Sequence, residues 1–347
     1  MAFALAAGVF IATLWLTGRL YRYAVTRKLF DVPNARSSHQ VATPRGGGMA
    51  IVATTIVGFV AAGSLHVLMW PVVLGLVGGG ALVGAIGFVD DHRPLAWRWR
   101  MLGHIVAGAW VLAWLGGLPP IPILGTVADL GWPGHVLALL YLVWLINLTN
   151  FMDGIDGIAA TEAVTVALGG VLLYFLVAPA EPEWIAPLIL MAASLGFLAW
   201  NWPPAKIFMG DAGSGFLGLM LGALSLQAAR TAPALLWGWI ILLAVFIVDA
   251  SITLIRRAIR GERLYEAHRT HAYQHTARRV GAHRPVTVTV AVINLAWLLP
   301  LAALVAQGSL RDVGGVLLAY VPLIVAALKL GSGKTDASSA ERAGWNV

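Results

Sequence analysis

The sequence contains no cysteine and very little charge. Of its 347 residues only 11% are charged, whereas 59% are hydrophobic. Without cysteine, disulfide bonds and cysteine-ligated metal sites are excluded. A soluble domain carries about 25% charged residues, and the mean hydropathy here is +0.81. The composition therefore predicts a polytopic membrane protein, and its 15 tryptophans suit the interfacial belts of a bilayer.

The apolar runs predict an all-α fold. A helix needs about 20 mostly apolar residues to cross a bilayer, and by that measure we expect about eleven transmembrane helices. The first lacks a basic leading segment, so we expect it to be retained rather than cleaved. The expected spans are 3–22, 47–68, 71–89, 101–118, 134–149, 159–178, 184–200, 213–229, 234–256, 286–306 and 312–330.

The basic residues predict the orientation. If the loops after odd-numbered spans are cytoplasmic, all of the 23 Lys and Arg lie on or beside that side except Arg230 and Arg311. Basic residues favour cytoplasmic loops, so the N-terminus is expected outside and the C-terminus inside. The expected cytoplasmic loops are 23–46, 90–100, 150–158, 201–212 and 257–285.

Residues 1–330 are predicted to form one transmembrane domain, and residues 331–347 a polar, disordered tail. The tail begins with "GSGKT". This stretch resembles part of a phosphate-binding loop, but it lacks the preceding strand and the full spacing.

Polar residues gather at the expected cytoplasmic boundary. In "NLTNFMDGIDGIAA", Asn147, Asn150, Asp153 and Asp156 recur every three residues. On a helix each such step turns the side chain back by about 60°, so all four lie within half of its circumference. Helix capping explains one or two aspartates at this boundary but not five, and ionisable groups there usually mark a functional site. The five are Asp90, Asp91, Asp153, Asp156 and Asp211.

Clustered carboxylates suit a hard cation. Mg²⁺ is typically held by one or two carboxylates together with substrate phosphates, and we expect Mn²⁺ as a substitute. Crowded carboxylates also repel one another, which raises a pKa and can leave one of them as a base. The pattern therefore predicts a metal-assisted reaction on a phosphate.

Two stretches before the second span offer phosphate donors. Arg45 precedes Gly46–Gly48, where glycine amides can approach an anion. The same glycines equally permit a turn or close helix packing, and both interpretations stay open. Upstream, "DVPNARSSHQ" is either a solvated loop or a set of donors for phosphate or sugar. Its polar residues are Asp31, Asn34, Arg36, Ser37 and His39.

Residues 256–284 form the one long hydrophilic loop, with seven arginines before Arg284. Its basic residues either bind anionic lipid or, with His268 and His271, donate to a nucleotide diphosphate. The two histidines could hold a transition metal, but no other soft ligand accompanies them. Nucleotide binding fits better.

Five stretches together resemble the polyprenyl-phosphate N-acetylaminosugar-1-phosphate transferases, glycosyltransferase family 4 in the broad sense. They occur in the order of that family and cover about residues 31–275. They are "DVPNARSSHQVATPRGGG", "GFVDDHRPLAWRWRMLGH", "NLTNFMDGIDGIAA", "NWPPAKIFMGDAGSGFLG" and "HRTHAYQ". The spaced histidines differ from the consecutive run of the peptidoglycan branch. They look more like the O-antigen and exopolysaccharide initiators, which argues against a muramoyl-pentapeptide substrate.

The resemblance implies roles for individual residues. Asp90 and Asp91 match the paired catalytic carboxylates, one of which deprotonates the lipid phosphate or attacks as a nucleophile. Asp211 matches the Mg²⁺ ligand, with Asp91 as a second expected ligand. The "NLTNFMDGID" residues match the motif around the metal and nucleotide, where we assign Asp153 and Asp156 to catalysis. The expected substrate-binding residues are Asn34, Arg36, His39, Arg45, Asn147, Asn150, Lys206, His268, Arg269 and His271.

The implied reaction is transfer of N-acetylhexosamine-1-phosphate from a UDP-sugar to undecaprenyl or another polyprenyl phosphate, releasing UMP. It would start O-antigen or a related surface polysaccharide, at a bacterial inner membrane with the site facing the cytoplasm. No nucleic acid partner is expected, and a homodimer is left open. A secondary transporter would show inverted repeats and midplane charges, and a CDP-alcohol phosphotransferase would place its acids and an arginine in one motif. Both remain alternatives.

Overall fold

The computed structural model describes residues 1–33, 41–123, 125–264 and 268–335, and this part of the chain is mostly helical. Its strands form two short antiparallel pairs: β1 (Phe30–Asp31) with β2 (Thr43–Pro44), and β3 (Ile121–Ile123) with β4 (Thr126–Ala128). The predicted all-α, polytopic fold is confirmed.

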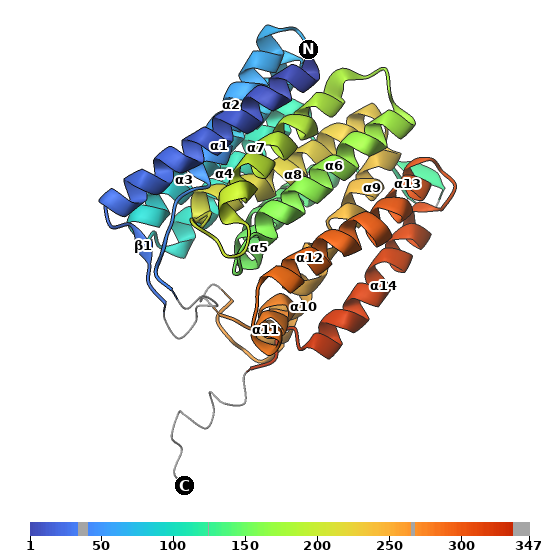
Figure 1. Cartoon of the computed structure of the whole chain (residues 1–347). Coiled ribbons are helices and arrows are strands. Elements are labelled where there is room, and N and C mark those ends of the chain that lie inside the picture. The colour runs from blue at the N-terminus through green and yellow to red at the C-terminus, as the bar shows by residue number, and fades with distance from the viewer. Residues whose placement is uncertain (34–40, 124, 265–267, 336–347) are drawn as a thin grey trace.

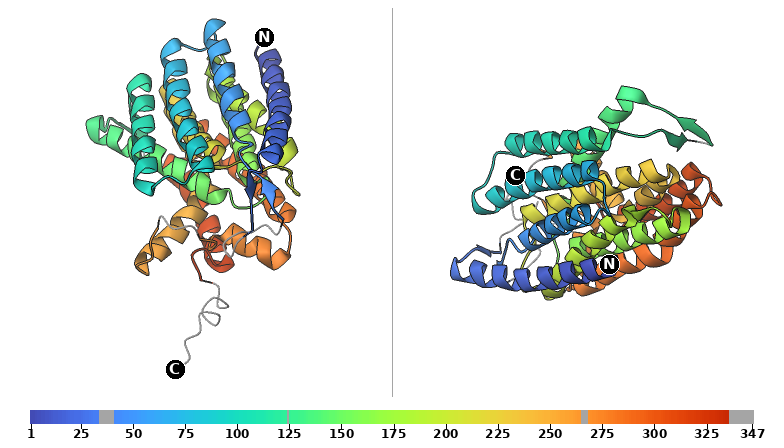
Figure 2. Two further views of the ribbon diagram at one scale, coloured as in Figure 1. Left: turned by 90° about the vertical axis from the view of Figure 1, so that its left-hand side faces the viewer. Right: turned by 90° about the horizontal axis from the view of Figure 1, so that it is seen from above.

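The long helices lie side by side in one bundle, and the N-terminus and the end of the last helix lie at opposite ends of it (Figures 1 and 2). The first half contains α1 (Ala2–Thr26), α2 (Met49–Ser64), α3 (Trp70–His92), α4 (Trp97–Leu115), α5 (Gly131–Met152), α6 (Ile158–Val177), the 3-10 turn η1 (Pro182–Trp184) and α7 (Ile185–Asn201). The second half contains α8 (Asp211–Thr231), α9 (Ala234–Leu242), α10 (Ala244–Ile259), α11 (Ala272–Val280), α12 (Arg284–Ile293), the π-helical turn η2 (Asn294–Leu298), α13 (Leu299–Ala306) and α14 (Asp312–Leu330).

Each predicted span coincides with one helix or with consecutive helices. The range 234–256 is bent by 66° between α9 and α10, and the range 286–306 runs through α12, η2 and α13. Among the described residues, eight helical segments are long and apolar enough to span a membrane, and the bent pair makes a ninth. The shorter helix α2 and the helix α4, whose first turn carries two arginines, lie outside this set. The number of crossings and their orientation stay predictions.

Helix α8 is the centre of the bundle, because it is buried along its whole apolar stretch. It packs against α3 and α5, and glycine lets the backbones approach closely. A Cβ at Gly218 would lie 2.3 Å from the carbonyl oxygen of Leu145 on α5, a separation too short for any side chain. Small residues at helix contacts are a usual means of close packing in membrane proteins.

The start of α8 is held by two other segments. A Cβ at Gly87, on α3, would lie 2.4 Å from the Cα of Ala212, and a Cβ at Gly48 would lie 2.5 Å from the Cα of Gly213. The N–H of Gly48 donates to the carbonyl of Met209 (2.9 Å). The N–H of the neighbouring Gly47 donates to the carbonyl of Phe208. Of the two open interpretations of the glycine run, these contacts favour close packing over anion binding.

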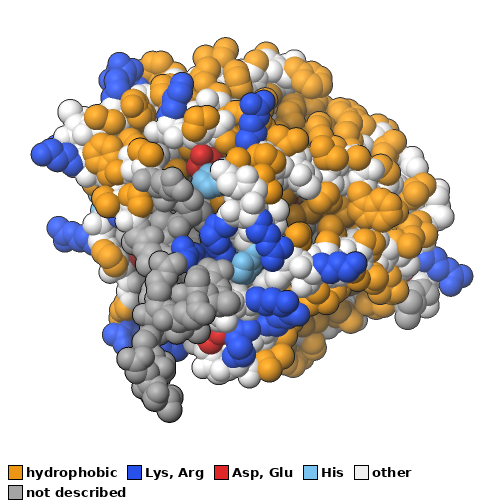
Figure 3. Space-filling model, turned by 60° about the horizontal axis from the view of Figure 1, so that its bottom comes forward, with side chains coloured by type: hydrophobic (Ala, Val, Ile, Leu, Met, Phe, Trp, Pro, Cys, Tyr) orange, Lys and Arg blue, Asp and Glu red, His pale blue; other side chains and the backbone are white. Residues whose placement is uncertain are grey.

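One end of the bundle is polar. Seen from that end, Lys and Arg side chains surround a few acidic and histidine side chains, while hydrophobic side chains cover the flanks (Figure 3). The ends of α3, α5 and α10 and the start of α8 meet here, so the structure brings the predicted cytoplasmic loops to one face (Figure 1).

We expect Gly87→Ala to destabilise the protein by about 1–3 kcal/mol, the usual effect of overpacking a tight contact. The added methyl group would collide with the backbone of α8 rather than with a movable side chain. The midpoint of thermal unfolding in detergent should fall. The control is Gly8→Ala on α1, where a Cβ would meet no atom within 4 Å. Equal midpoints for Gly87→Ala and Gly8→Ala would contradict the close contact.

Candidate active site

Asp91 connects the end of α3 to the start of α8. Its carboxylate accepts hydrogen bonds from the N–H of Asp211 (3.0 Å) and from the N–H of Ala212 (3.3 Å). The first N–H groups of a helix have no partner within the helix and favour an anion, so Asp91 is a cap supplied from another helix. It is 6% exposed. Gly210 has a positive φ of 79°, and a Cβ there would lie 2.6 Å from the Asp91 carboxylate.

Arg100 holds the carboxylates of Asp90 and Asp211 together. Its Nη1 lies 2.8 Å from Asp90 Oδ2 and 3.0 Å from Asp211 Oδ2. Asp90 also accepts a hydrogen bond from the N–H of Leu95. A single cation therefore offsets the repulsion between two acids that come from α3 and α8. Our sequence analysis missed Arg100, although a basic residue at the edge of an apolar helix, ten positions after Asp90, was a usable signal.

Asp153 has a different environment. It directly follows α5 and is half-buried, and among the described residues no hydrogen bond to its carboxylate is found. Burial raises the pKa of Asp153 well above its usual value, and repulsion by Asp211, Asp91 and Asp156 raises it further. Such a carboxyl is suited to hold or accept a proton.

Asp156 lies in the same connection but ties segments together. Its Oδ2 accepts a hydrogen bond from the N–H of Ala205 (3.0 Å), and its Oδ1 lies 3.2 Å from His283 Nδ1. Its carbonyl accepts a hydrogen bond from the Thr287 hydroxyl (2.8 Å). Asp156 thus joins the α5–α6 connection to the α7–α8 connection and to α12. These contacts hold the three segments together, and the catalytic role that we predicted for Asp156 stays a prediction.

Asn201, which the sequence analysis also missed, supports the same connections. Its Oδ1 accepts from the N–H of Gly157 (3.0 Å), and its Nδ2 donates to the carbonyl of Ile207 (2.9 Å). Asn201 ends α7 within the "NWPPAKIFMGD" stretch and is buried. A lone asparagine at the end of an apolar helix gives no sign of which loop it will bind.

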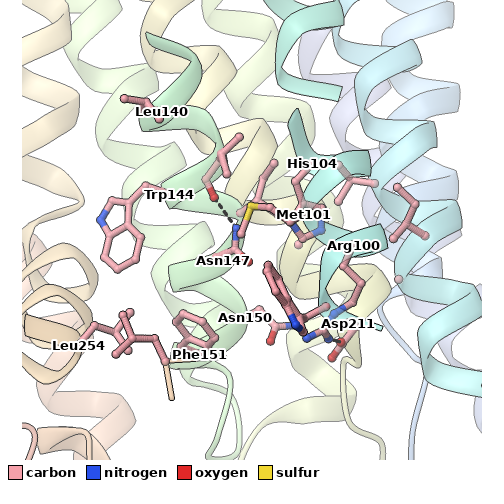
Figure 4. Close-up of a pocket in the computed structure, with 18 residues that line it drawn as sticks. Arg100, Met101, His104, Leu140, Trp144, Asn147, Asn150, Phe151, Asp211 and Leu254 are labelled. Carbon is pink, nitrogen blue, oxygen red and sulfur yellow. Dashed lines mark hydrogen bonds and ion pairs between the residues drawn. The ribbon is translucent and has the colours of Figure 1, made fainter. Parts of the chain in front are cut away.

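A cavity of about 560 Å³ opens beside the carboxylates. At one end Arg100, Asn150 and Asp211 lie close together, while Trp144 and Leu140 line it farther away (Figure 4). Asn150 donates to the Ser214 hydroxyl (3.1 Å). The lining is otherwise mainly apolar, so the cavity has a polar head and an apolar body. The remaining lining residues are Val83, Ile86, Gly87, Trp97, Met101, His104, Val143, Ile146, Asn147, Phe151, Gly215, Leu254 and Leu264.

Several predicted substrate-binding residues have other contacts. Arg45 donates to the carbonyl oxygen of Asp91, so it stabilises the end of α3. The Lys206 ammonium lies 5.4 Å from the centre of the Trp200 ring. Of the predicted pair on α5, Asn147 lines the cavity and donates to the Val143 carbonyl (2.7 Å). The predicted residues Asn34, Arg36 and His39 lie outside the described residues.

Asp249 anchors residues 268–275, which we name the histidine-bearing segment. This carboxylate accepts from the N–H groups of Ala272 (2.9 Å) and Tyr273 (3.1 Å), which begin α11. His271 lies 3.7 Å from the same carboxylate and is 1% exposed. The His271 side chain is therefore enclosed by protein, and the substrate-binding role that we predicted for it stays a prediction.

His268 lies nearer to the cavity. Its ring stacks on the His271 ring, with centroids 4.9 Å apart, and lies 6.3 Å from the ring of Phe151, which lines the cavity. Burial, followed by the positive charges of His271 and Arg257, lowers the pKa of His268 to about 3, so it is neutral at pH 7. The neighbouring Arg269 accepts a hydrogen bond from Arg278 through its carbonyl (3.1 Å).

The donor set is suited to a hard cation that is completed by a substrate. Among the described residues no group of three or more His, Asp or Glu is arranged to hold a metal ion. Mg²⁺, however, is usually bound through one or two carboxylates plus phosphate oxygens. Asp90 and Asp211 are close enough to share one cationic nitrogen. The fit is therefore good for an ion that binds together with a phosphate, and poor for a site built by protein ligands alone.

The structure thus combines a polytopic helical bundle, an acidic site at one end and a mainly apolar cavity beside that site, and comparison with known proteins gives its class. Residues 73–229 match glycosyl transferase family 4. A phospho-N-acetylmuramoyl-pentapeptide-transferase of Streptomyces avermitilis is 34% identical over 59% of this chain and 70% of its own length. The chain belongs to glycosyl transferase family 4, as the sequence motifs predicted.

Two further relatives cover more of the chain. A probable undecaprenyl-phosphate N-acetylglucosaminyl 1-phosphate transferase of Bacillus subtilis is 28% identical over 82% of this chain and 79% of its own length. A decaprenyl-phosphate N-acetylglucosaminephosphotransferase of Mycolicibacterium smegmatis is 29% identical over 81% of this chain and 76% of its own length. The similarity therefore extends well beyond the matched residues 73–229.

We expect Asp153→Asn to raise the thermal midpoint at neutral pH. The raised pKa means that the folded protein retains a proton that the unfolded chain releases, so the charged form of Asp153 costs stability as the pH rises. The gain should shrink as the pH falls toward about 4, the ordinary pKa of aspartate. The midpoints should be measured in EDTA between pH 4 and 8.

The matched control is Glu181→Gln, at an exposed position near the opposite end of the bundle. It removes the same charge and should leave the midpoint almost unchanged. A lower midpoint for Asp153→Asn at neutral pH, or a difference independent of pH, would contradict the assigned environment of Asp153.

Proposed function

We propose that this protein transfers N-acetylhexosamine-1-phosphate from a UDP-sugar to a polyprenyl phosphate such as undecaprenyl phosphate. A lipid phosphate oxygen forms a bond to the β-phosphorus of the nucleotide sugar, and the bond from that phosphorus to the oxygen of UMP breaks. The observation that carries the proposal is the cavity with a cationic and acidic head at Arg100 and Asp211 and an apolar body beyond it.

The cavity matches the two parts of the lipid acceptor. Its apolar lining, between α3, α4, α5, α8 and α10, can take the isoprenoid chain, which gains stability by leaving water. The phosphate would then lie at the polar end, within reach of the Arg100 guanidinium. Two carboxylates fix Arg100 at this end through one nitrogen, Nη1, so the other N–H groups of its guanidinium can donate to a phosphate.

The acids divide the remaining work. Asp91 fixes the start of α8 and thereby the position of Asp211. Asp153 is our candidate for accepting the proton of the lipid phosphate, because its environment favours the protonated form. Asp90 and Asp211 would hold Mg²⁺, which would offset the repulsion between the two phosphates when bound. Asn150 lies at the same end of the cavity and is held there by its hydrogen bond to Ser214.

The donor is proposed to bind at the cytoplasmic face near His268 and the α5–α6 connection. The names of the relatives support an N-acetylhexosamine-1-phosphate as the transferred group, since two are N-acetylglucosamine-1-phosphate transferases and one acts on a muramoyl-pentapeptide. The spaced histidines favour a simple N-acetylhexosamine. A role at the start of O-antigen or another cell-surface polysaccharide follows as the working proposal, with the bacterial inner membrane as the location.

The test is UMP release by the purified protein in detergent. The assay supplies undecaprenyl phosphate and a panel of UDP-N-acetylhexosamines, with Mg²⁺, with Mn²⁺ or with EDTA. We expect release that requires the lipid, a divalent ion and one preferred donor. Release without the lipid would indicate hydrolysis instead, and no release with any donor from folded protein would refute the proposal.

We expect Arg100→Gln to lower kcat/KM for transfer by about 100-fold or more, the usual effect of removing a charged group that stabilises a transferred phosphate. The control is Arg98→Gln, two residues away, where the side chain is exposed and should change kcat/KM less than about twofold. The midpoint of thermal unfolding should be measured for both variants. Equal activity of the two variants would remove Arg100 from the site.

A further inference from the structure

The sequence "GSGK" at the start of the predicted tail is docked on the protein. Gly331 ends α14 in a left-handed conformation, with φ of 97°. Ser332 is fully buried, and its hydroxyl donates to Asp249 Oδ1 (2.8 Å). This contrasts with the disordered tail that we predicted from residue 331, and residues 336–347 lie outside the described part of the chain.

Three more hydrogen bonds fasten this segment, Gly331–Lys334, which we name the C-terminal clamp. The N–H of Gly333 donates to the carbonyl of Thr270 (2.6 Å), and Arg256 donates to the carbonyl of Ser332 (2.7 Å). The carbonyl of Lys334 lies 3.1 Å from His275 Nε2. The clamp thus binds the histidine-bearing segment at two points, Thr270 and His275, and binds α10 at Arg256.

The two glycines have a conformational reason. Gly333 has φ of 75°, and a Cβ there would lie 2.8 Å from the Cβ of Arg256. Together with the left-handed conformation of Gly331 at the end of α14, this accounts for both glycines of "GSG" by backbone conformation, with no need for a phosphate-binding role. The chain must turn sharply after α14, bury one hydroxyl, and then pass close to α10.

Asp249 is the point where the clamp and the histidine-bearing segment meet. The same Oδ1 atom accepts hydrogen bonds from Ser332, from the N–H of Ala272 and from Thr253 (3.2 Å). A carboxylate buried in the bundle is stable only when several donors surround it. Removing the Ser332 hydroxyl would therefore weaken the support on which the start of α11 depends.

Helix α11 carries this support to the catalytic end. It lies against α10, α12 and α14 at the polar end of the bundle (Figure 1). The Tyr273 hydroxyl donates to the carbonyl of Phe151 (2.9 Å) at the end of α5, two residues before Asp153. The fit is tight, since a Cβ at Gly154 would lie 2.2 Å from the Tyr273 hydroxyl. Movement of α11 would therefore displace Phe151 and His268.

We propose that the C-terminal clamp positions the segment from His268 to Tyr273 for the nucleotide-sugar donor, with Ser332 as a positioning residue. This rests on the proposed function, in which that segment borders the donor. The clamp acts through Asp249 and α11, so it should affect donor binding rather than the apolar cavity, whose lining includes neither Ser332 nor Asp249. A chain cut before Ser332 would keep every helix and lose this support.

The first test is hydrogen–deuterium exchange of the full-length protein in detergent, without ligands. We expect Ser332→Ala to speed exchange of the amides of residues 270–275 by about tenfold, since the lost bond is to a charged acceptor. The control is Thr335→Ala, three residues later, where the side chain is exposed; it should exchange like the unaltered protein. Unchanged exchange in Ser332→Ala would overturn the clamp.

The second test separates positioning from general damage. In the UMP-release assay Ser332→Ala should raise the KM for the UDP-sugar about tenfold, while kcat and the KM for undecaprenyl phosphate change less than about twofold. Equal loss in all three parameters, or none, would overturn the positioning role. If the unaltered protein releases no UMP, the proposed function fails, and UDP-N-acetylglucosamine binding by calorimetry to both variants then decides the clamp. Equal affinities would overturn it.

Discussion

The contact on which the site depends is the one between the Asp91 carboxylate and the first N–H groups of α8. It joins the end of one helix to the start of another, and glycines at Gly87 and Gly48 allow the backbones to meet. Because α8 is the buried centre of the bundle, its start is held from several sides. Asp211 is the first residue of that helix, so its position is set by the same contact.

A site made of like charges needs cations and amide donors to hold it together. Asp91 is balanced by N–H groups, and Asp90 and Asp211 are balanced by Arg100. Two unit charges about 4 Å apart in a partly solvated site repel by about 4 kcal/mol at an effective dielectric constant near 20. Asp153 has no such partner in the described part of the chain. Asp153 is therefore the acid that binds a proton most readily, which makes its location beside Asp91 and Asp211 informative.

Much of the architecture could be predicted because hydropathy and the positions of basic residues report on the solvent directly. The helices and the gathering of five aspartates at one end follow from that signal. The rotation of each helix about its axis and the partner of each polar side chain do not follow from hydropathy. Hydropathy does not show that Arg100 joins Asp90 to Asp211, or that Asn201 binds the α5–α6 connection. Hydropathy also does not show that His271, which the motif assigns to substrate binding, is enclosed by packing against Asp249.

The location of the charges also separates the proposed enzyme from a transporter. A transporter needs ion-binding groups near the middle of the membrane, reachable in turn from both sides. Asp249, an acid within a predicted span that could serve such a pathway, is occupied by the backbone of α11 and by Ser332. The Arg100 and Asp211 pair instead lies at one end of a cavity whose other lining is mainly apolar. Such a cavity can keep a hydrocarbon chain out of water while its charged head meets a soluble donor, which is the arrangement that a phosphosugar transfer to a lipid requires.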